Sequence, residues 1–243
     1  MAFRTEDGIP VPAVTAEQMR EVDRIAVEDF GLGILQMMEN AGRNLAQNVL
    51  GMLDGKRGEV TVLVGSGGNG GGGLCCARHL HNRGFKVWVV LDREADVLTG
   101  AARNQLDILT ATGLEPADSS QAEEAIWRSE IVVDALIGYG LRGAPTGRTA
   151  DLITLCLQGA ARVLSLDVPS GLNATTGDKP GPAMSPDRTL TLALPKTGLH
   201  NVPGDLYLAD IGIPPEVYHP IGISFEPFFE GRYWIPLVVE ESS

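Results

Sequence analysis

The 243-residue sequence is poor in the residue types that stabilise small secreted domains or bind nucleic acid. It has three cysteines, two of them adjacent, and no C-x-x-C pair, which argues against a disulfide framework or a structural zinc site. Basic residues are also scarce, since 19 lysines and arginines against 31 aspartates and glutamates leave a formal net charge of −12. A surface that neutralises many phosphates is not expected, and we predict no binding to nucleic acid.

Long hydrophobic runs are missing as well. No stretch approaches the roughly 18 uninterrupted apolar residues of a membrane span, and the N-terminus lacks the apolar run of a signal peptide. We therefore expect no membrane contact and a cytoplasmic, reducing location. Apolar residues make up 44% and charged residues 21% of the chain, which is typical of a folded globular protein rather than a disordered one.

Residues 1–55 are predicted to form a helical N-terminal extension. Thr15 and Gln18 have the spacing of a capping box, and apolar residues recur at helical spacing after them. The sequence FGLG at residues 30–33 interrupts this pattern, and a second apolar helical face then follows from Leu35 to Val49.

The remainder of the chain alternates short apolar runs with segments of helical length. The expected strands are Val60–Val64, Lys86–Leu91, Ile131–Ala135, Arg162–Leu166, Thr189–Leu194 and Leu206–Ile211. The expected helices are Leu74–Asn82, Leu98–Thr112 and Asp151–Gln158. This alternation predicts an α/β fold, a Rossmann-like three-layer αβα sandwich with a mostly parallel sheet. We expect a single domain over residues 1–243, with this core at residues 56–215 and a C-terminal tail at residues 216–243.

The most conspicuous motif is GSGGNGGGG at residues 65–73, between the first strand and the first helix of the predicted core. Successive glycines have no Cβ atoms, so their backbone N–H groups can turn toward an anion, and the following helix adds its N-terminal partial positive charge. A phosphate is the expected ligand, although a flexible loop is the simpler alternative. No G-K-[ST] follows, which argues against a P-loop.

Two further strands of the predicted core end in an aspartate. Asp134 precedes a glycine-bearing segment, and Asp167 precedes the sharp turn that contains Ser170. Together with Asn69, these side chains are expected at the edge of the sheet where ligands bind in open α/β folds. Such converging oxygens suit a hard cation, but they could equally raise the pKa of one carboxyl for acid–base chemistry, and the sequence leaves both open.

Other polar residues are weaker candidates. Lys196 and His200 follow a predicted strand, but a lone lysine or histidine more often lies at the surface or supports the scaffold. Cys75 and Cys76 open the helix after the glycine tract, where a thiol pKa can be lowered, although simple packing is the more frequent role. Asp92 lies at about the distance from the tract at which an NAD-dependent dehydrogenase places its ribose-binding carboxylate.

Six segments in order resemble the YjeF N-terminal domain family, whose characterised members are NAD(P)H-hydrate epimerases. These segments are AEQMREVDRIAVEDFGLGILQMMENAGRNL, VTVLVGSGGNGGGGLCCARHL, DALIGYGLRG, LDVPSGLNATTG, ALPKTGL and LADIGIP. They cover nearly everything from Thr15 to about Pro215. The resemblance implies the Rossmann-like fold and an isomerase that interconverts the R and S forms of hydrated NADH or NADPH in nicotinamide nucleotide repair.

The resemblance also implies roles for individual residues. By this resemblance, Asp167 is expected to be the catalytic acid–base group and to contact the substrate. A potassium ion, the expected cofactor, would be held by Asn69, Asp134 and Ser170. The other substrate-binding residues that it implies are Gly68, Asn69, Gly70, Gly71, Gly72, Gly138, Tyr139, Gly140, Leu141, Arg142, Gly143 and Ala144.

Two positions depart from the family pattern, because Gly68 and Gly72 stand where the family has asparagine and aspartate. A catalytically degenerate domain that acts as a nucleotide-binding scaffold or regulatory module is therefore the alternative to an epimerase. An NAD-dependent dehydrogenase would rest on Asp92 and the glycine tract, and it would leave the other five segments unexplained. The family further implies a separate NAD(P)H-hydrate dehydratase as pathway partner, because the chain has no room for a fused one, and a possible homodimer through the N-terminal helices.

Overall fold

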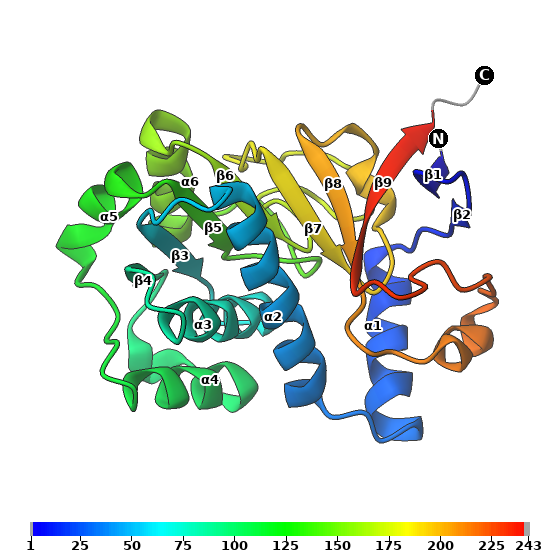
Figure 1. The fold of residues 1–243 in the computed structure, drawn as a ribbon. Coiled ribbons are helices and arrows are strands. Elements are labelled where there is room, and N and C mark those ends of the chain that lie inside the picture. Colours follow the sequence, from blue (N-terminus) through cyan, green and yellow to red (C-terminus); the bar gives the residue numbers. More distant parts are fainter. Residues whose placement is uncertain (1, 241–243) are drawn as a thin grey trace.

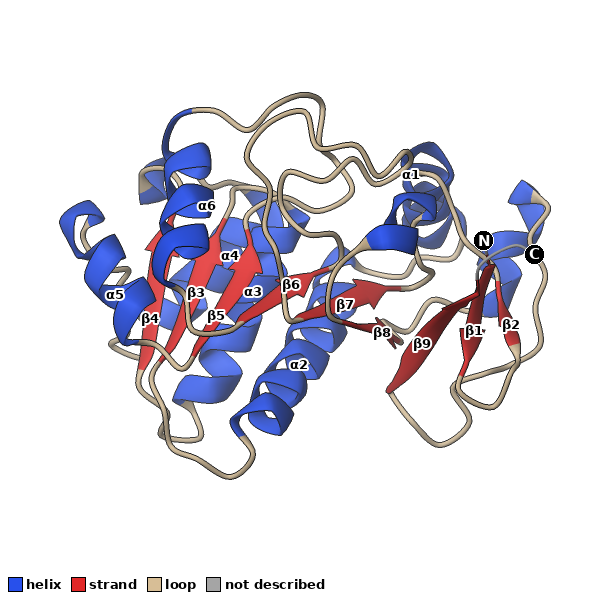
Figure 2. Ribbon diagram, turned by 90° about the horizontal axis from the view of Figure 1, so that it is seen from above, coloured by secondary structure: helices blue, strands red, loops and turns tan. Residues whose placement is uncertain are grey.

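The computed structural model describes residues 2–240, and a single nine-stranded sheet runs through them in the order β2-β1-β9-β8-β7-β6-β5-β3-β4 (Figure 2). The strands are β1 (Ala2–Thr5), β2 (Pro10–Val11), β3 (Val60–Val64), β4 (Val87–Leu91), β5 (Ile131–Ala135), β6 (Val163–Leu166), β7 (Arg188–Leu192), β8 (Asp205–Ala209) and β9 (Trp234–Glu240). The block from β4 to β8 is parallel, whereas β9, β1 and β2 pair antiparallel with their neighbours.

Helices cover both faces of the parallel block (Figures 1 and 2). They are α1 (Ala16–Arg24), α2 (Ile34–Leu53), α3 (Gly68–His81), α4 (Gly100–Thr110), α5 (Ala122–Arg128) and α6 (Gly147–Gly159). A π-helical turn follows α1 at Ile25–Asp29, and 3₁₀ turns lie at Ala95–Val97, Ser119–Gln121, Thr197–Asn201 and Pro215–Ile221. Side chains of α2, α3 and α4 share one core, and those of α5 and α6 share another. The predicted αβα sandwich with a mostly parallel sheet is confirmed.

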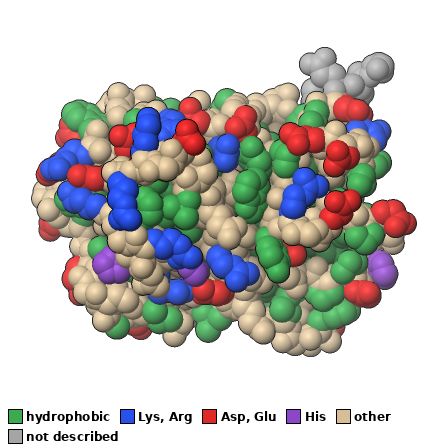
Figure 3. All heavy atoms as spheres, viewed as in Figure 1, with side chains coloured by type: hydrophobic (Ala, Val, Ile, Leu, Met, Phe, Trp, Pro, Cys, Tyr) green, Lys and Arg blue, Asp and Glu red, His purple; other side chains and the backbone are tan. Residues whose placement is uncertain are grey.

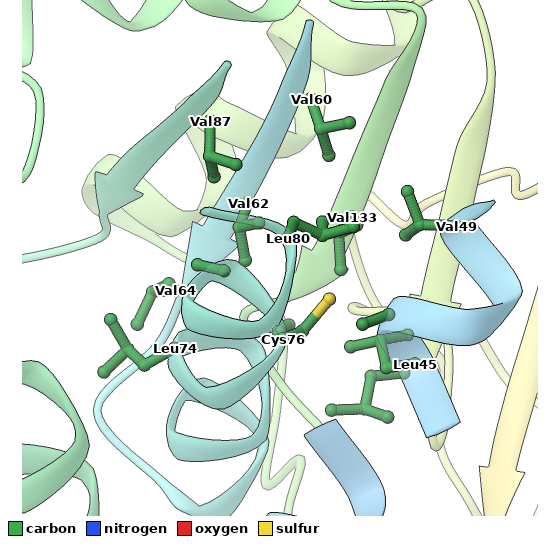
Figure 4. Packing of buried hydrophobic residues seen from close by; sticks show 14 of the residues in the cluster. Leu45, Val49, Val60, Val62, Val64, Leu74, Cys76, Leu80, Val87 and Val133 are labelled. Carbon is green, nitrogen blue, oxygen red and sulfur yellow. The ribbon is translucent and has the colours of Figure 1, made fainter. Parts of the chain in front are cut away.

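The central strand β3 explains why two helical layers are needed. Val62 and Val64 point to the core under α3, where they lie near Leu74 (Figure 4), whereas Leu63 belongs to the opposite core with Ile126 of α5. All five residues of β3 are buried. Since burying one such aliphatic side chain contributes about 1.5–3 kcal/mol, a strand that is apolar on both faces is stable only when both faces are covered.

Most predicted elements of the core are confirmed with small shifts at their ends. The capping box is confirmed too, because Gln18 N donates to Thr15 Oγ1 at 3.2 Å and Thr15 N donates to Gln18 Oε1 at 2.9 Å. The interruption at FGLG is confirmed by Gly31, whose φ of 72° ends the preceding helical turn. The short helix α5 was not predicted.

The prediction for the two ends of the chain is wrong in part. Residues 2–11 form β1 and β2 instead of helix, and the segment expected to be a tail contains β9. Strand β9 lies between β8 and β1, with Phe3 opposite Val239, so the first and last described residues belong to the same part of the sheet. These strands are stabilised by partners far away in sequence, which local patterns do not reveal.

The glycine tract is helical over most of its length, which corrects the expected start of that helix at Leu74. Helix α3 begins at Gly68, and Gly70 to Gly73 are buried in its first turns. A Cβ on Gly70 would overlap the carbonyl oxygen of Gly65, and one on Gly73 would lie 2.6 Å from Cβ of Ala135. These glycines therefore allow α3 to lie unusually close to the ends of β3 and β5.

The outer face of α2, α3 and α4 is chemically mixed. Figure 3 shows acidic and basic side chains interspersed with apolar ones on this side of the molecule. Within residues 2–240, no helix combines the length and the apolarity that a membrane crossing requires.

Candidate active site

A pocket of about 710 Å³ lies at the carboxyl ends of the parallel strands. Its floor comes from residues that follow β3, β5, β6 and β7, and its walls come from α1 and α2. The volume falls within the range of about 300–1,000 Å³ that is typical of small-molecule sites. Its lining includes Met19, Arg20, Asp23, Met37, Met38, Gly68, Asn69, Gly72, Gly138, Tyr139, Gly140, Leu166, Asp167, Leu192, Lys196 and Ile211.

Asp167 lies at the end of β6 with an unusual backbone conformation. Its φ is +66°, a left-handed value that residues other than glycine rarely adopt, and only 3% of the residue is exposed. Its amide donates to the carbonyl of Leu190 at 2.7 Å, which holds the residue against β7. A non-glycine residue in such a conformation is often found at a functional site, where the surrounding structure compensates the strain.

Lys196 forms a buried ion pair with Asp167. Its ammonium group contacts Oδ1 of Asp167 and donates to the carbonyl of Leu192 at 2.8 Å, and only 1% of the lysine is exposed. Two charges so far from water are tolerated because they neutralise each other and are hydrogen-bonded. The sequence alone makes Lys196 a weak candidate, although it belongs to ALPKTGL, one of the six segments that resemble the family.

Asp134 is fully buried beneath the pocket and accepts hydrogen bonds from neutral groups. The donors are Ser170 Oγ at 2.5 Å, Ser165 Oγ at 2.8 Å and Ser170 N at 2.9 Å, with Leu136 N at 3.3 Å. Burial raises the pKa of the Asp134 carboxyl, while the hydrogen bonds from Ser170 and Ser165 oppose the shift. Among residues 2–240, no lysine or arginine forms an ion pair with it.

Asn69 connects this buried cluster to the pocket. Its side-chain amide donates to the carbonyl of Leu166, the residue before Asp167, at 2.8 Å. The side-chain oxygen of Asn69 lies beside Gly138, where an added Cβ would be 2.7 Å away. The predicted convergence of three strand ends is thus present in the structure.

Helix α1 is attached to the pocket through Asp23. The hydroxyl of Tyr139 donates to Asp23 Oδ2, and the guanidinium of Arg20 lies 5.9 Å from the centre of the Tyr139 ring. Burial raises the pKa of Asp23, while the hydrogen bond from Tyr139 and the charge of Lys196 oppose the shift. Asp23 and Tyr139 therefore close one side of the pocket with their hydrogen bond.

The predicted substrate-binding residues divide into two groups. Gly68, Asn69, Gly72, Gly138, Tyr139, Gly140 and Asp167 line the pocket. Gly70 and Gly71 are instead buried against Gly65 and Met38, and Leu141, Arg142, Gly143 and Ala144 follow in the outer loop beyond the lining. The roles assigned to all of these residues stay predictions.

The weaker candidates have structural partners away from the pocket. His200 stacks on Phe3 with ring centres 4.4 Å apart. Asp92 accepts hydrogen bonds from Arg93 and from Thr149 Oγ1, each at 2.8 Å, and it does not line the pocket. Its position therefore gives no support to a dehydrogenase.

Fold and site together define an α/β protein of the Rossmann-like class, with a small-molecule pocket at the strand ends and a buried aspartate–lysine pair inside it. The model of the family described as YjeF-related protein N-terminus matches residues 34–198. The chain belongs to this family, and the prediction made from its six segments is confirmed.

Relatives and one solved structure agree with this assignment. The chain is 45% identical to the NAD(P)H-hydrate epimerase of Dehalogenimonas lykanthroporepellens over 99% of both chains, and 36% identical to that of Truepera radiovictrix over 93% of this chain and 100% of the relative. It is also 36% identical to the bifunctional NAD(P)H-hydrate repair enzyme of Moorella thermoacetica, over 84% of this chain but 41% of the relative. The crystal structure of yeast ynu0 has the same fold, with a TM-score of 0.83 and 22% identity over 93% of this chain and 100% of that one.

Proposed function

We propose that this chain is an NAD(P)H-hydrate epimerase, which interconverts the R and S forms of hydrated NADH or NADPH. Relatives that match it from end to end carry this name. The observation that carries the proposal is the pocket at the strand ends, in which the buried carboxylate of Asp167 is paired with Lys196.

The chemistry requires a group that moves a proton and tolerates positive charge. The hydrate is a hemiaminal, with its hydroxyl on the ring carbon next to the nitrogen. Inversion of that carbon proceeds either by loss of the hydroxyl to leave an iminium ion, or by ring opening to an aldehyde. On either route, a carboxylate such as that of Asp167 can carry the proton, and on the first it also stabilises the developing cation.

The nucleotide part of the substrate suits the start of α3. Gly68 and Asn69 line the pocket in the first turn of this helix, where free backbone N–H groups and the helix dipole favour a phosphate. Neither Gly68 nor Gly72 brings a side chain into this region, so the phosphate would be bound mainly by backbone groups.

Potassium fits the residues beneath the pocket. Asp134 is a wholly buried carboxylate whose hydrogen-bond donors are neutral, so a cation would balance its charge. Asn69 and Ser170 would hold the ion with it, since oxygen atoms are the ligands that hard cations prefer. When bound, potassium supplies a fixed positive charge close to the substrate site.

A binding module without catalysis is the alternative, favoured by the absence of side chains on the pocket-lining Gly68 and Gly72. For the epimerase, the pathway partner is an NAD(P)H-hydrate dehydratase that consumes the S form. A homodimer and a cytoplasmic location stay predictions.

A coupled assay tests the proposal. An excess of a dehydratase specific for the S form is added to the epimer mixture of NADH hydrate or NADPH hydrate, and the slow conversion of the remaining R form is followed. We expect the protein to accelerate this phase in potassium buffer, and to do so more weakly when potassium is replaced by tetramethylammonium. Asp167→Asn is expected to remove the acceleration, whereas Asp178→Asn, at an exposed position, leaves it intact.

The controls separate the two functions. Well-folded protein that accelerates neither hydrate is not an epimerase. If such protein still binds either hydrate in a calorimetric titration, the binding module is the correct assignment. If the protein accelerates conversion of the R form equally with and without potassium, the proposed ion site is wrong and the epimerase assignment stands.

A further inference from the structure

The two oxygens of the Asp167 carboxylate have different surroundings. Oδ1 accepts from the Lys196 ammonium group, from Leu192 N at 3.2 Å and from Thr191 Oγ1 at 3.4 Å. Oδ2 has no hydrogen-bond donor within the described chain, although Asp167 lines the pocket. Three donors therefore fix one oxygen and leave the other available to a ligand.

We propose that Lys196 is a positioning residue, which anchors Oδ1 of Asp167 and keeps the carboxylate ionised so that Oδ2 exchanges the proton with the substrate. This inference rests on the proposed epimerase function. In the forward step, Oδ2 receives a proton from the substrate or returns one to it, and Lys196 stays protonated throughout. No oxidant or further reactant is needed.

Lys196 is itself held firmly by backbone contacts. It follows the turn after β7, where Ala193 has a φ of +64°. The flanking Pro195 and Thr197 bond to Val14, through Val14 N to Pro195 O at 2.9 Å and Thr197 N to Val14 O at 3.0 Å. The ammonium group is also bonded to the carbonyl of Leu192 at 2.8 Å. A lysine ordered in this way loses little entropy when it orients a neighbouring group.

The other charged groups around Asp167 cannot replace this lysine. Asp23 faces it across the pocket with a like charge, and Tyr139 is neutral and bonded to Asp23. Arg20 lies behind the Tyr139 ring, 5.9 Å from its centre, and has no contact with Asp167. Lys196 is therefore the cation that balances Asp167, and its removal would leave this buried carboxylate without a counter-charge.

The first test uses three variants in the coupled assay. We expect Lys196→Met to lower kcat by about 10- to 1,000-fold with little change in KM, and to shift the acidic limb of the kcat/KM profile upward by about 1–3 pH units, the usual effect of one neighbouring charge. Lys196→Gln, which keeps a donor but no charge, shifts the limb as well. Lys179→Met changes an exposed lysine and leaves the profile unchanged.

Arginine at position 196 distinguishes positioning from direct proton transfer. Arginine keeps the charge and the donors but cannot give up a proton. We expect Lys196→Arg to retain a wild-type acidic limb, and ethylammonium to restore part of the activity of Lys196→Ala. If folded Lys196→Arg is as inactive as Lys196→Met, a retained charge and retained donors do not suffice, and the positioning role is wrong.

A measurement without turnover distinguishes a failure of this inference from a failure of the proposed function. Carboxyl carbon NMR spectra of the protein are recorded from pH 3 to pH 9, and the Asp167 signal is assigned by its loss in Asp167→Asn. We expect this signal to titrate at higher pH in Lys196→Met than in the wild type. Identical titration of the two proteins overturns the role of Lys196 even in an active enzyme, whereas a wild type without epimerase activity overturns the proposed function.

Discussion

The hydroxyl group of Tyr139 donates a hydrogen bond to the carboxylate of Asp23, joining the loop after β5 to helix α1 across the pocket. Burial is the main cause that raises the pKa of Asp23, and the bond from Tyr139 opposes this shift only in part. At neutral pH, the ionised form of Asp23 is therefore less favourable in the folded protein than in the unfolded chain.

The sign of this shift predicts how stability depends on pH. Between the ordinary pKa of an aspartate and the raised one, the folded state binds more protons than the unfolded state, so the free energy of unfolding falls as pH rises. We expect Asp23→Asn to increase this free energy more at pH 7 than at pH 4, as measured by urea unfolding. The exposed Asp151→Asn serves as control, and an equal effect of Asp23→Asn at both pH values would contradict the prediction.

The glycines at the start of α3 give a matched pair of substitutions. A Cβ on Gly70 would overlap the carbonyl of Gly65, whereas one on Gly68 meets nothing within 4 Å. We expect Gly70→Ala to lower the free energy of unfolding by about 3 kcal/mol or more, since backbone cannot give way cheaply. Gly68→Ala should be neutral or stabilise by up to about 1 kcal/mol, because alanine favours the helix. Similar urea midpoints for the two variants would show that the close packing is not needed.

The family carboxylate can be restored at Gly72, but not without a change in packing. A Cβ there would lie 2.9 Å from Cδ2 of Leu166. We therefore expect Gly72→Asp to cost about 1–3 kcal/mol of stability, and the double variant with Leu166→Val to recover part of it. Thermal unfolding of the two single variants and the double variant measures this coupling, and strict additivity would argue against it.

The three free thiols are predicted to be unreactive in the folded protein. Cys75, Cys76 and Cys156 are buried, and burial, reinforced by the charge of Glu39, raises the pKa of Cys75 to about 12. Against an ordinary thiol pKa of about 8.5, the thiolate fraction of Cys75 at neutral pH is roughly 3,000-fold smaller. Thiol titration should find no fast-reacting group in the native protein and three in denaturant. A single fast thiol in the native protein would contradict the burial of Cys75.

Much of this architecture could be predicted because it is encoded locally. Strands β3 and β5 are buried runs of mostly apolar residues, and the Thr15 capping box needs only four residues. The position of Asp134 and Ser170 follows from the rule that the carboxyl ends of parallel strands meet at one edge of the sheet.

The importance of Lys196 cannot be read from local sequence, because its partner, Asp167, lies 29 residues earlier. The helical state of the glycine tract was missed because glycine is a poor helix former, and only the tertiary contacts of Gly70 and Gly73 explain it.

The pairing of β1 with β9 also bears on how the protein is made. During synthesis β1 is made long before its partner on the sheet side, β9. Until then, β1 can pair only with the two-residue strand β2, which is too short to be stable alone. The parallel block from β4 to β8 can assemble before β9 is made, whereas the antiparallel edge forms only once β9 is available to pair with β1.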